Sequence, residues 1–124
     1  MEFDSSSPIW LQLVGECSRR IVTGEWPAGS RLPGVRDLGV ELGVNPNTVQ
    51  RAMAELDRQS ITVTDRTKGR FVTDDVARID ELRAQVATAH ADEFVRRALG
   101  LGMTAERAVQ LISNRWRAME GESA

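Results

Sequence analysis

Apolar residues recur at helical spacing in three stretches of the first half of the chain, and each stretch predicts an amphipathic helix. The first helix is expected to open at Pro8 and to end at Gly24. Its apolar stripe consists of Trp10, Leu13, Val14, Cys17 and Ile21. A short second helix is expected at about residues 35–42. The third begins at Pro46, and its stripe consists of Val49, Ala52, Met53 and Leu56.

The third helix has clear start signals and a polar outer face. Asn45 can cap it by accepting a backbone N–H bond, and Pro46 suits the first helical position. Gly43 separates it from the second helix, which is the helix-turn-helix pattern. Its polar face carries Asn47, Thr48, Gln50, Arg51, Glu55 and Arg58. Asn, Gln and Arg can read base edges, although a solvated helix face explains this one pattern equally well.

The elements on either side of this helix favour a DNA-binding domain. Residues 61–64 alternate as a strand does, residues 67–69 suit a turn, and residues 71–73 suit a returning strand. Lys68 and Arg70 would lie at the tip of this hairpin, where they suit phosphate or minor-groove contact. Three helices followed by a hairpin form a winged helix-turn-helix.

Two more helices are predicted after Asp75, with no strand between them. Asp74 and Asp75 can cap the first, residues 100–102 stop it, and Thr104 can cap the second. Each has an apolar stripe that two helices alone cannot bury, so a second copy of the chain is the favoured partner. The alternative is that both helices pack back onto their own winged domain. We therefore expect a mainly α fold, with a winged helix-turn-helix over 8–73 and a two-helix dimerisation hairpin over 74–124.

Composition excludes several classes of function. The chain has 124 residues, and no apolar run approaches a membrane span, so no membrane is expected as a partner. The first seven residues are polar, are expected to be disordered and lack the features of a signal peptide, which favours a cytoplasmic location. One His and one Cys offer too few ligands for a metal site, and no nucleotide-binding loop follows a strand. We expect no metal, no cofactor and no enzymatic activity.

The charge distribution and the single cysteine leave alternatives open. The net charge of −2 is a mild argument against DNA binding, but residues 31–70 carry seven basic and five acidic side chains. Cys17 lies on the apolar stripe of the first helix, where it suits buried packing. A redox-sensing thiol is the alternative interpretation.

Residues 8–72 resemble the N-terminal domain of GntR-family bacterial transcription regulators. The matching segments are residues 8–13, 21–24, 27–33, 35–38, 42–44, 48–49, 52–53 and 68–72. Residues 45–51, followed by a short tail, are similar to the YtrA-type subgroup. The chain departs from the family at Ser60 and Thr67, where glycine is usual or frequent, which affects the turn of the wing.

The resemblance implies a homodimer that binds double-stranded DNA at an inverted repeat and represses transcription, with an ABC-transporter operon as the target of YtrA-type proteins. The tail is too short to enclose the ligand pocket of larger relatives, so a small effector, itself unknown, would bind at the dimer interface or between domains. A winged-helix protein-interaction module that does not read DNA is the alternative. The near-neutral charge favours that alternative and the polar third helix disfavours it.

The expected DNA-binding residues fall into two groups, according to whether their side chains can reach bases or only the DNA backbone. Gln50 and Arg51 can reach bases, whereas Asn47 and Thr48 lie near the helix N-terminus, where phosphate is the natural partner. Arg36 occupies a position that contacts DNA in the family. The wing should contact phosphate or the minor groove through Lys68, Gly69 and Arg70.

Overall fold

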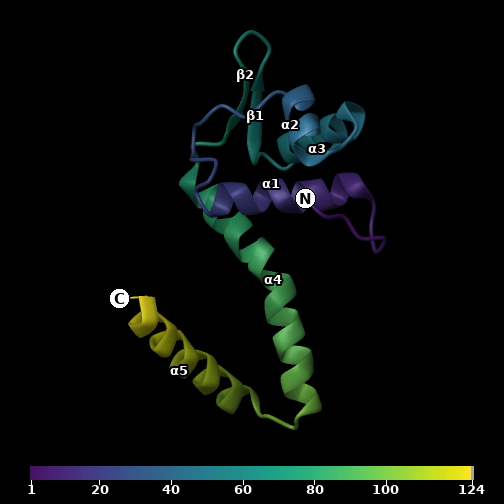
Figure 1. Ribbon diagram of the computed structural model, residues 1–124. Coiled ribbons are helices and arrows are strands. Elements are labelled where there is room, and N and C mark those ends of the chain that lie inside the picture. The colour runs from purple at the N-terminus through teal and green to yellow at the C-terminus, as the bar shows by residue number, and fades with distance from the viewer. Residues whose placement is uncertain (124) are drawn as a thin grey trace. The chain divides into compact units, whose positions relative to one another are not determined.

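The computed structural model describes residues 1–123. The described chain forms five helices and one two-stranded antiparallel hairpin (Figure 1). The elements are α1 Ile9–Val22, α2 Val35–Leu42, α3 Pro46–Arg58, β1 Thr62–Asp65, β2 Gly69–Val72, α4 Val76–Gly100 and α5 Ala105–Ser123. The expected mainly α, winged-helix architecture is confirmed. The chain divides into two compact units, Met1–Val86 and a second unit that begins at Ala87.

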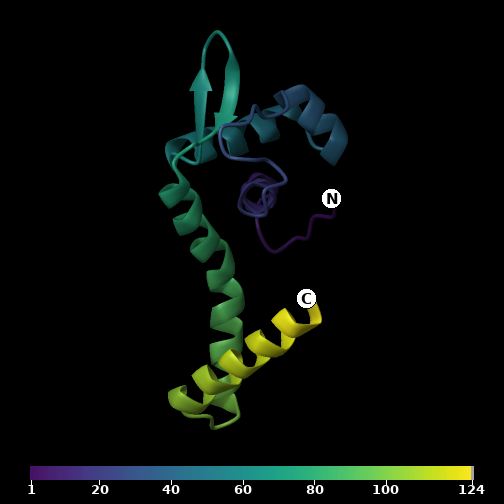
Figure 2. The ribbon, with the colours of Figure 1, turned by 90° about the vertical axis from the view of Figure 1, so that its left-hand side faces the viewer.

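The first unit is built around α3. The apolar stripe of α3 faces α1 on one side and α2 on the other, and Figure 2 looks nearly along the axis of α1. Three of its largest fully buried side chains come from three different helices, namely Leu13, Leu38 and Met53. Cys17 is also fully buried, and burial raises the pKa of its thiol to about 12. A thiol in this state reacts poorly, so the structure supports the packing role of Cys17 over a redox role.

The turn between α2 and α3 depends on a close backbone approach. The backbone N–H of Val44 donates to the carbonyl of Gly39 at 2.8 Å. A Cβ atom added at Gly39 would lie 2.6 Å from the carbonyl oxygen of Val44. Glycine at this position therefore lets the chain reverse tightly after α2. Asn45 then caps α3, since its side chain accepts from the N–H of Asn47 at 2.8 Å, as the sequence predicted.

The hairpin is anchored by backbone bonds on a second edge, unlike a free two-stranded ribbon. Its register pairs Thr62 with Val72 and Thr64 with Arg70. The other edge of β2 pairs with the segment that precedes α2, because Val72 N–H donates to the Ser30 carbonyl at 2.8 Å and Leu32 N–H to the Arg70 carbonyl at 2.9 Å. Both strands were predicted within two residues of their observed ends. The base of the wing is thus held on both sides.

The helix α4 begins inside the first unit. Asp75 caps it by accepting from the N–H groups of Ala77 and Arg78. Ile79 and Leu82 are buried in the core of the first unit, and Val86 packs against that core. The alternative in which the tail packs back onto the winged domain therefore holds for the first turns of α4.

The second unit contains the rest of α4 and α5. Thr104 caps α5 by accepting from the N–H of Arg107 at 3.3 Å, as expected. The two helices diverge from the turn that joins them (Figure 1). Side chains on both helices are left open to solvent, for example Leu99 at 69% and Trp116 at 65% exposure. No helix of residues 1–123 is both long and apolar enough to cross a membrane.

The N-terminal residues differ from expectation. Residues 1–7 were expected to be disordered, but Phe3 packs against the core of the first unit. The amide of Gln12 donates to the carbonyls of Asp4 and Ser7 at 2.9 and 2.8 Å. These residues are ordered because Phe3 packs on the core and the Gln12 side chain binds their backbone.

Candidate nucleic-acid interface

The outer face of α3 carries an exposed row of side chains near its N-terminus. Asn47, Gln50 and Arg51 are all exposed, and Thr48 is partly buried beside them. Residues spaced by three and four share one face of a helix, so the first three form a single surface. Asn, Gln and Arg are the side chains that can contact base edges with two hydrogen bonds.

Ala54 extends this row by one turn and was missed in the sequence analysis. It is exposed and lies seven residues after Asn47 on the same face. A methyl group on a reading face can contact the methyl of thymine. The signal that identifies it is the helical spacing itself, since Asn47, Gln50, Arg51 and Ala54 follow i, i+3, i+4 and i+7.

Arg51 is held by an aromatic ring. Its guanidinium carbon lies 4.4 Å from the centre of the Trp10 ring. Trp10 was expected only as part of the core stripe of α1, and it is partly buried against that core. The contact joins the beginning of α1 to the exposed face of α3.

Arg70 is committed to a contact within the protein. Its guanidinium donates to both carboxylate oxygens of Asp57 at 3.2–3.3 Å and to the hydroxyl of Thr64 at 3.1 Å. Asp57 also accepts from the hydroxyls of Thr62 and Thr64. Burial alone would raise the pKa of Asp57, but these donors together lower it below its ordinary value. Arg70 therefore ties β2 to α3, and it does not point freely from the tip of the wing.

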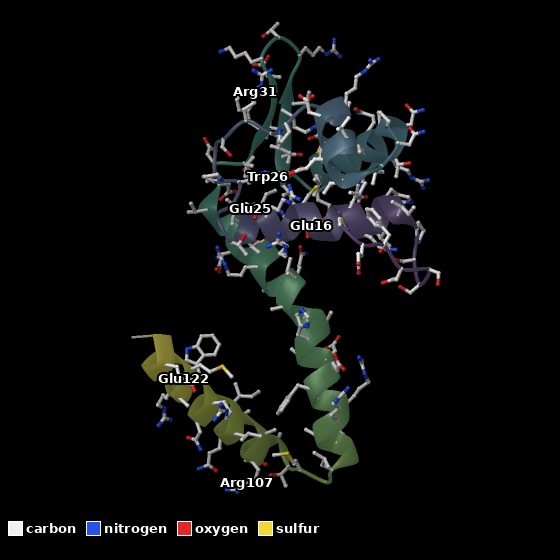
Figure 3. The ribbon with its side chains drawn as sticks, in the orientation of Figure 1. Glu16, Glu25, Trp26, Arg31, Arg107 and Glu122 are labelled. Atoms are coloured by element: carbon white, nitrogen blue, oxygen red, sulfur yellow. The ribbon has the colours of Figure 1, made fainter. Side chains whose placement is uncertain are left out.

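Gly69 makes room for an arginine from outside the hairpin. Its φ of 110° lies in the region that favours glycine, and an added Cβ would lie 3.0 Å from Nε of Arg31. Figure 3 shows Arg31 beside the hairpin. Arg31 and Arg66 line a cleft of about 270 Å³ between the wing and the segment leading into α2. Neither was among the expected site residues, although Arg31 belongs to the segment 27–33 that matches the family.

Most cations of residues 31–70 have no carboxylate partner among the described residues. Seven basic residues lie in the region 31–70. Five of them make no ion pair within the part of the chain that the structure describes, namely Arg31, Arg36, Arg51, Arg66 and Lys68. The other two, Arg58 and Arg70, pair with Glu55 and Asp57. Glu41 pairs with Arg20 on α1. The near-neutral net charge therefore conceals a locally positive surface.

Lys68 and Arg36 are exposed, as a contact with DNA requires. Lys68 lies in the turn of the hairpin, and its own backbone N–H donates to the carboxylate of Asp65 at 3.1 Å. Arg36 opens α2. Of the expected residues, the structure thus gathers Asn47, Gln50 and Arg51 on one face of α3, places Lys68 and Arg36 on separate exposed elements, and turns Arg70 inward.

The second unit offers a surface of another kind. An apolar groove of about 200 Å³ is lined by Phe94, Ala98, Leu99, Ala108 and Ile112. Its lining comes from both helices of that unit. Among residues 1–123, no group of three or more His, Cys, Asp or Glu side chains could hold a metal ion.

Comparison with known proteins gives one consistent result. The sequence model of the family described as bacterial regulatory proteins, gntR family, matches residues 11–72. The chain is 35% identical over 109 residues to the HTH-type transcriptional regulator YhcF of Bacillus subtilis, which covers 88% of this chain and 90% of YhcF. It is 36% identical over 70 residues to the HTH-type transcriptional repressor YtrA of the same organism, over 56% of this chain and 54% of YtrA.

A solved structure extends the likeness beyond the winged helix. A GntR family transcriptional regulator from Listeria monocytogenes has a TM-score of 0.79 and 38% identity. The match covers 90% of this chain and 98% of that one. The likeness therefore includes most of α4 and α5 as well as the winged unit.

Proposed function

The chain belongs to the GntR family and is a DNA-binding helix-turn-helix transcription regulator, and we propose that it acts as a homodimeric repressor on an inverted-repeat operator. In this proposal α3 enters the major groove and reads bases through Gln50 and Arg51. Asn47, Thr48, Arg36 and Lys68 contact the backbone, and Arg31 and Arg66 join them. The protein acts in the cytoplasm, where the chromosome lies.

The observation that carries the proposal is the exposed row on α3 beside unpaired cations. Base reading needs donors and acceptors that are not already satisfied within the protein. Phosphate contact needs cations that are not cancelled by carboxylates. Both conditions hold on α3 and the neighbouring wing, and the alternative of a protein-interaction surface would favour apolar side chains there.

The second unit supports the proposed homodimer. Val109, Ile112 and Trp116 share one face of α5 and are 63%, 46% and 65% exposed in the single chain. Apolar surface of this kind gains free energy when a partner covers it, and a second copy is the partner always present. A symmetric dimer would place two α3 helices on two half-sites of an inverted repeat.

The name of one relative supports repression as the proposed outcome. YtrA, which is similar over 70 residues, is a transcriptional repressor by name. A dimer seated on a promoter blocks polymerase directly, and this chain needs no additional domain for that. The YtrA-type resemblance extends the proposal to an operon that encodes an ABC transporter, with any effector bound at the dimer interface.

The test uses the full chain and a duplex selected by the protein from a random library. Binding should weaken steeply as salt rises, because each phosphate contact releases counterions. Gln50→Ala should cost about 1–3 kcal/mol on the selected duplex and relax preference at one position, whereas Lys68→Ala should weaken binding to selected and scrambled duplexes alike. Absence of any duplex binding at low salt would favour the protein-interaction alternative.

Dimerisation is tested separately by sedimentation. Ile112→Asp places a charge on the apolar face of α5, and Asn114→Asp adds the same charge at an exposed position away from that face. Only the former should shift the protein toward monomer and weaken duplex binding, because two linked half-sites bind more tightly than one. A wild-type chain that stays monomeric at micromolar concentration would contradict the dimer.

A further inference from the structure

The contact between Arg51 and Trp10 joins a residue of the exposed α3 face to an aromatic ring of another helix. The guanidinium carbon of Arg51 lies 4.4 Å from the ring centre, within the range of a cation–π interaction. Trp10 follows Ile9 at the beginning of α1 and is partly buried against the core of the first unit. A ring fixed in this way is a rigid support for the flexible side chain that lies on it.

Two other arginines, Arg58 on α3 and Arg70 on β2, are held by carboxylates instead. Arg58 donates to both oxygens of Glu55 at 2.7–2.8 Å, and Arg70 donates to Asp57 and Thr64. In both cases a carboxylate accepts from the Nε–H of the arginine, and for Arg70 also from an Nη–H, and it offsets the positive charge. Arg51, by contrast, makes no hydrogen bond or ion pair through its side chain to any residue of the described part of the chain.

A ring holds a guanidinium without using its donors. The five N–H groups of arginine lie in the guanidinium plane, while the attraction to an aromatic ring acts through the face. The side chain can therefore be fixed in one orientation and still present its donor edge to a base. A carboxylate in place of the ring would also repel the phosphates of DNA.

We propose that Trp10 is a positioning residue for sequence reading, which stacks the Arg51 guanidinium in the free protein and so preorganises it for a base edge. The inference rests on the proposed function of α3. Its physical basis is that an arginine ordered before binding loses less conformational freedom when it binds. Trp10 itself need not touch DNA.

The proposal predicts a graded series at position 10. Trp10→Leu keeps an apolar side chain but removes the ring face, and it should weaken binding to the selected duplex by about two- to fivefold. Preference at the base pair read by Arg51 should relax, while binding to the scrambled duplex should change little. Trp10→Phe retains a ring with a weaker attraction and should fall between wild type and Trp10→Leu.

A double-mutant cycle separates positioning from a general effect on folding. In an Arg51→Ala background, Trp10→Leu should cause no further loss, because the side chain it positions is absent. Trp26→Leu is a matched control, since the Trp26 ring lies 5.3 Å from the guanidinium carbon of Arg20 in the same type of contact. This control removes a stacked ring away from α3 and should leave sequence preference unchanged.

A measurement without DNA completes the test. In the free protein, NMR relaxation of the Arg51 Nε–H group should show an ordered side chain, which becomes mobile in Trp10→Leu. The proposal is overturned if Trp10→Leu leaves affinity and preference unchanged. It is also overturned if Trp10→Leu raises affinity, because Arg51 would then have to leave the ring in order to bind DNA. It is equally overturned if the loss persists in the Arg51→Ala background. Failure of the wild-type chain to bind any duplex would instead overturn the proposed function.

Discussion

Removing the carboxylate of Asp57 should weaken the attachment of the wing to α3. Asp57 lies on α3, and its three partners Thr62, Thr64 and Arg70 all belong to the hairpin. The side chains of Asp57 and Arg70 are only 28% and 16% exposed, and Thr62 is 2% exposed. In Asp57→Ala, the Thr62 hydroxyl loses its partner in a buried site and the Arg70 cation loses its counterion.

The magnitude follows from these contacts. A hydrogen bond to a charged group is worth about 1.5–3 kcal/mol, and an unsatisfied buried polar group costs about 1–3 kcal/mol. The contributions are not additive, and solvent reaches part of the site, so we expect Asp57→Ala to lower the free energy of unfolding by about 2–4 kcal/mol. Asp57→Asn keeps an acceptor and should lower it by about 1–2 kcal/mol.

Urea unfolding followed by circular dichroism at one fixed protein concentration measures the effect. Asp80→Asn is the control, because it removes the carboxylate of an exposed pair with Arg83 and should change stability by less than about 0.5 kcal/mol. If Asp57→Ala is no more destabilising than Asp80→Asn, the argument for wing anchoring is wrong. Additive effects of Asp57→Ala and Arg70→Met would also refute it.

Acid should remove the same contribution. The pKa of Asp57 is lowered in the folded protein from its ordinary value of 3.8, so its carboxylate stabilises the fold fully at pH values above that. The contribution fades as the pH falls through the lower pKa of the folded state. The stability difference between wild type and Asp57→Asn should therefore be constant near neutral pH and shrink below about pH 4.

Three further substitutions or reactions test other parts of the fold. Ser60 has a φ of 59°, so Ser60→Gly should raise the free energy of unfolding by about 0.5–1 kcal/mol in thermal or urea melts. Gly39→Ala should lower it by about 1–3 kcal/mol because its Cβ would meet the Val44 carbonyl at 2.6 Å, whereas Gly15→Ala on α1 has open space and should be neutral or stabilising. Cys17, with a pKa of about 12, should resist thiol reagents until urea unfolds the chain, and rapid labelling of the native protein would contradict its burial.

Local signals in the sequence were sufficient for the helices and the wing. Asn45 and Thr104 cap helices because short polar side chains bond to backbone N–H groups in their own turn. The stripe of α3 is buried as predicted, since helical spacing alone determines which residues share a face. Features of this kind depend on residues within one or two turns of each other.

The site could be predicted only in part, because its detail depends on contacts distant in sequence. Arg70 was expected at the wing tip from its closeness to Lys68, but in the observed register it lies opposite Thr64 on β1, with its guanidinium in reach of Asp57 on α3. The stack of Arg51 on Trp10 likewise joins two helices whose approach is determined by core packing. Composition reveals how many charges a chain has, but only the folded structure reveals which of them cancel.

The beginning of α4 explains why the first compact unit extends beyond the wing. Arg78 donates to the carbonyl of Gln59 at 3.0 Å, at the C-terminal end of α3, and Arg83 donates to the carbonyl of Val22 at 3.2 Å, at the end of α1. The last carbonyls of a helix lack hydrogen-bond donors within the helix and lie at the negative end of its dipole. A guanidinium supplies both the N–H donors and a positive charge. Together with buried Leu82, these bonds make the first turns of α4 a structural part of the winged unit. The first turns of α4 are thereby fixed to the helix proposed to read DNA.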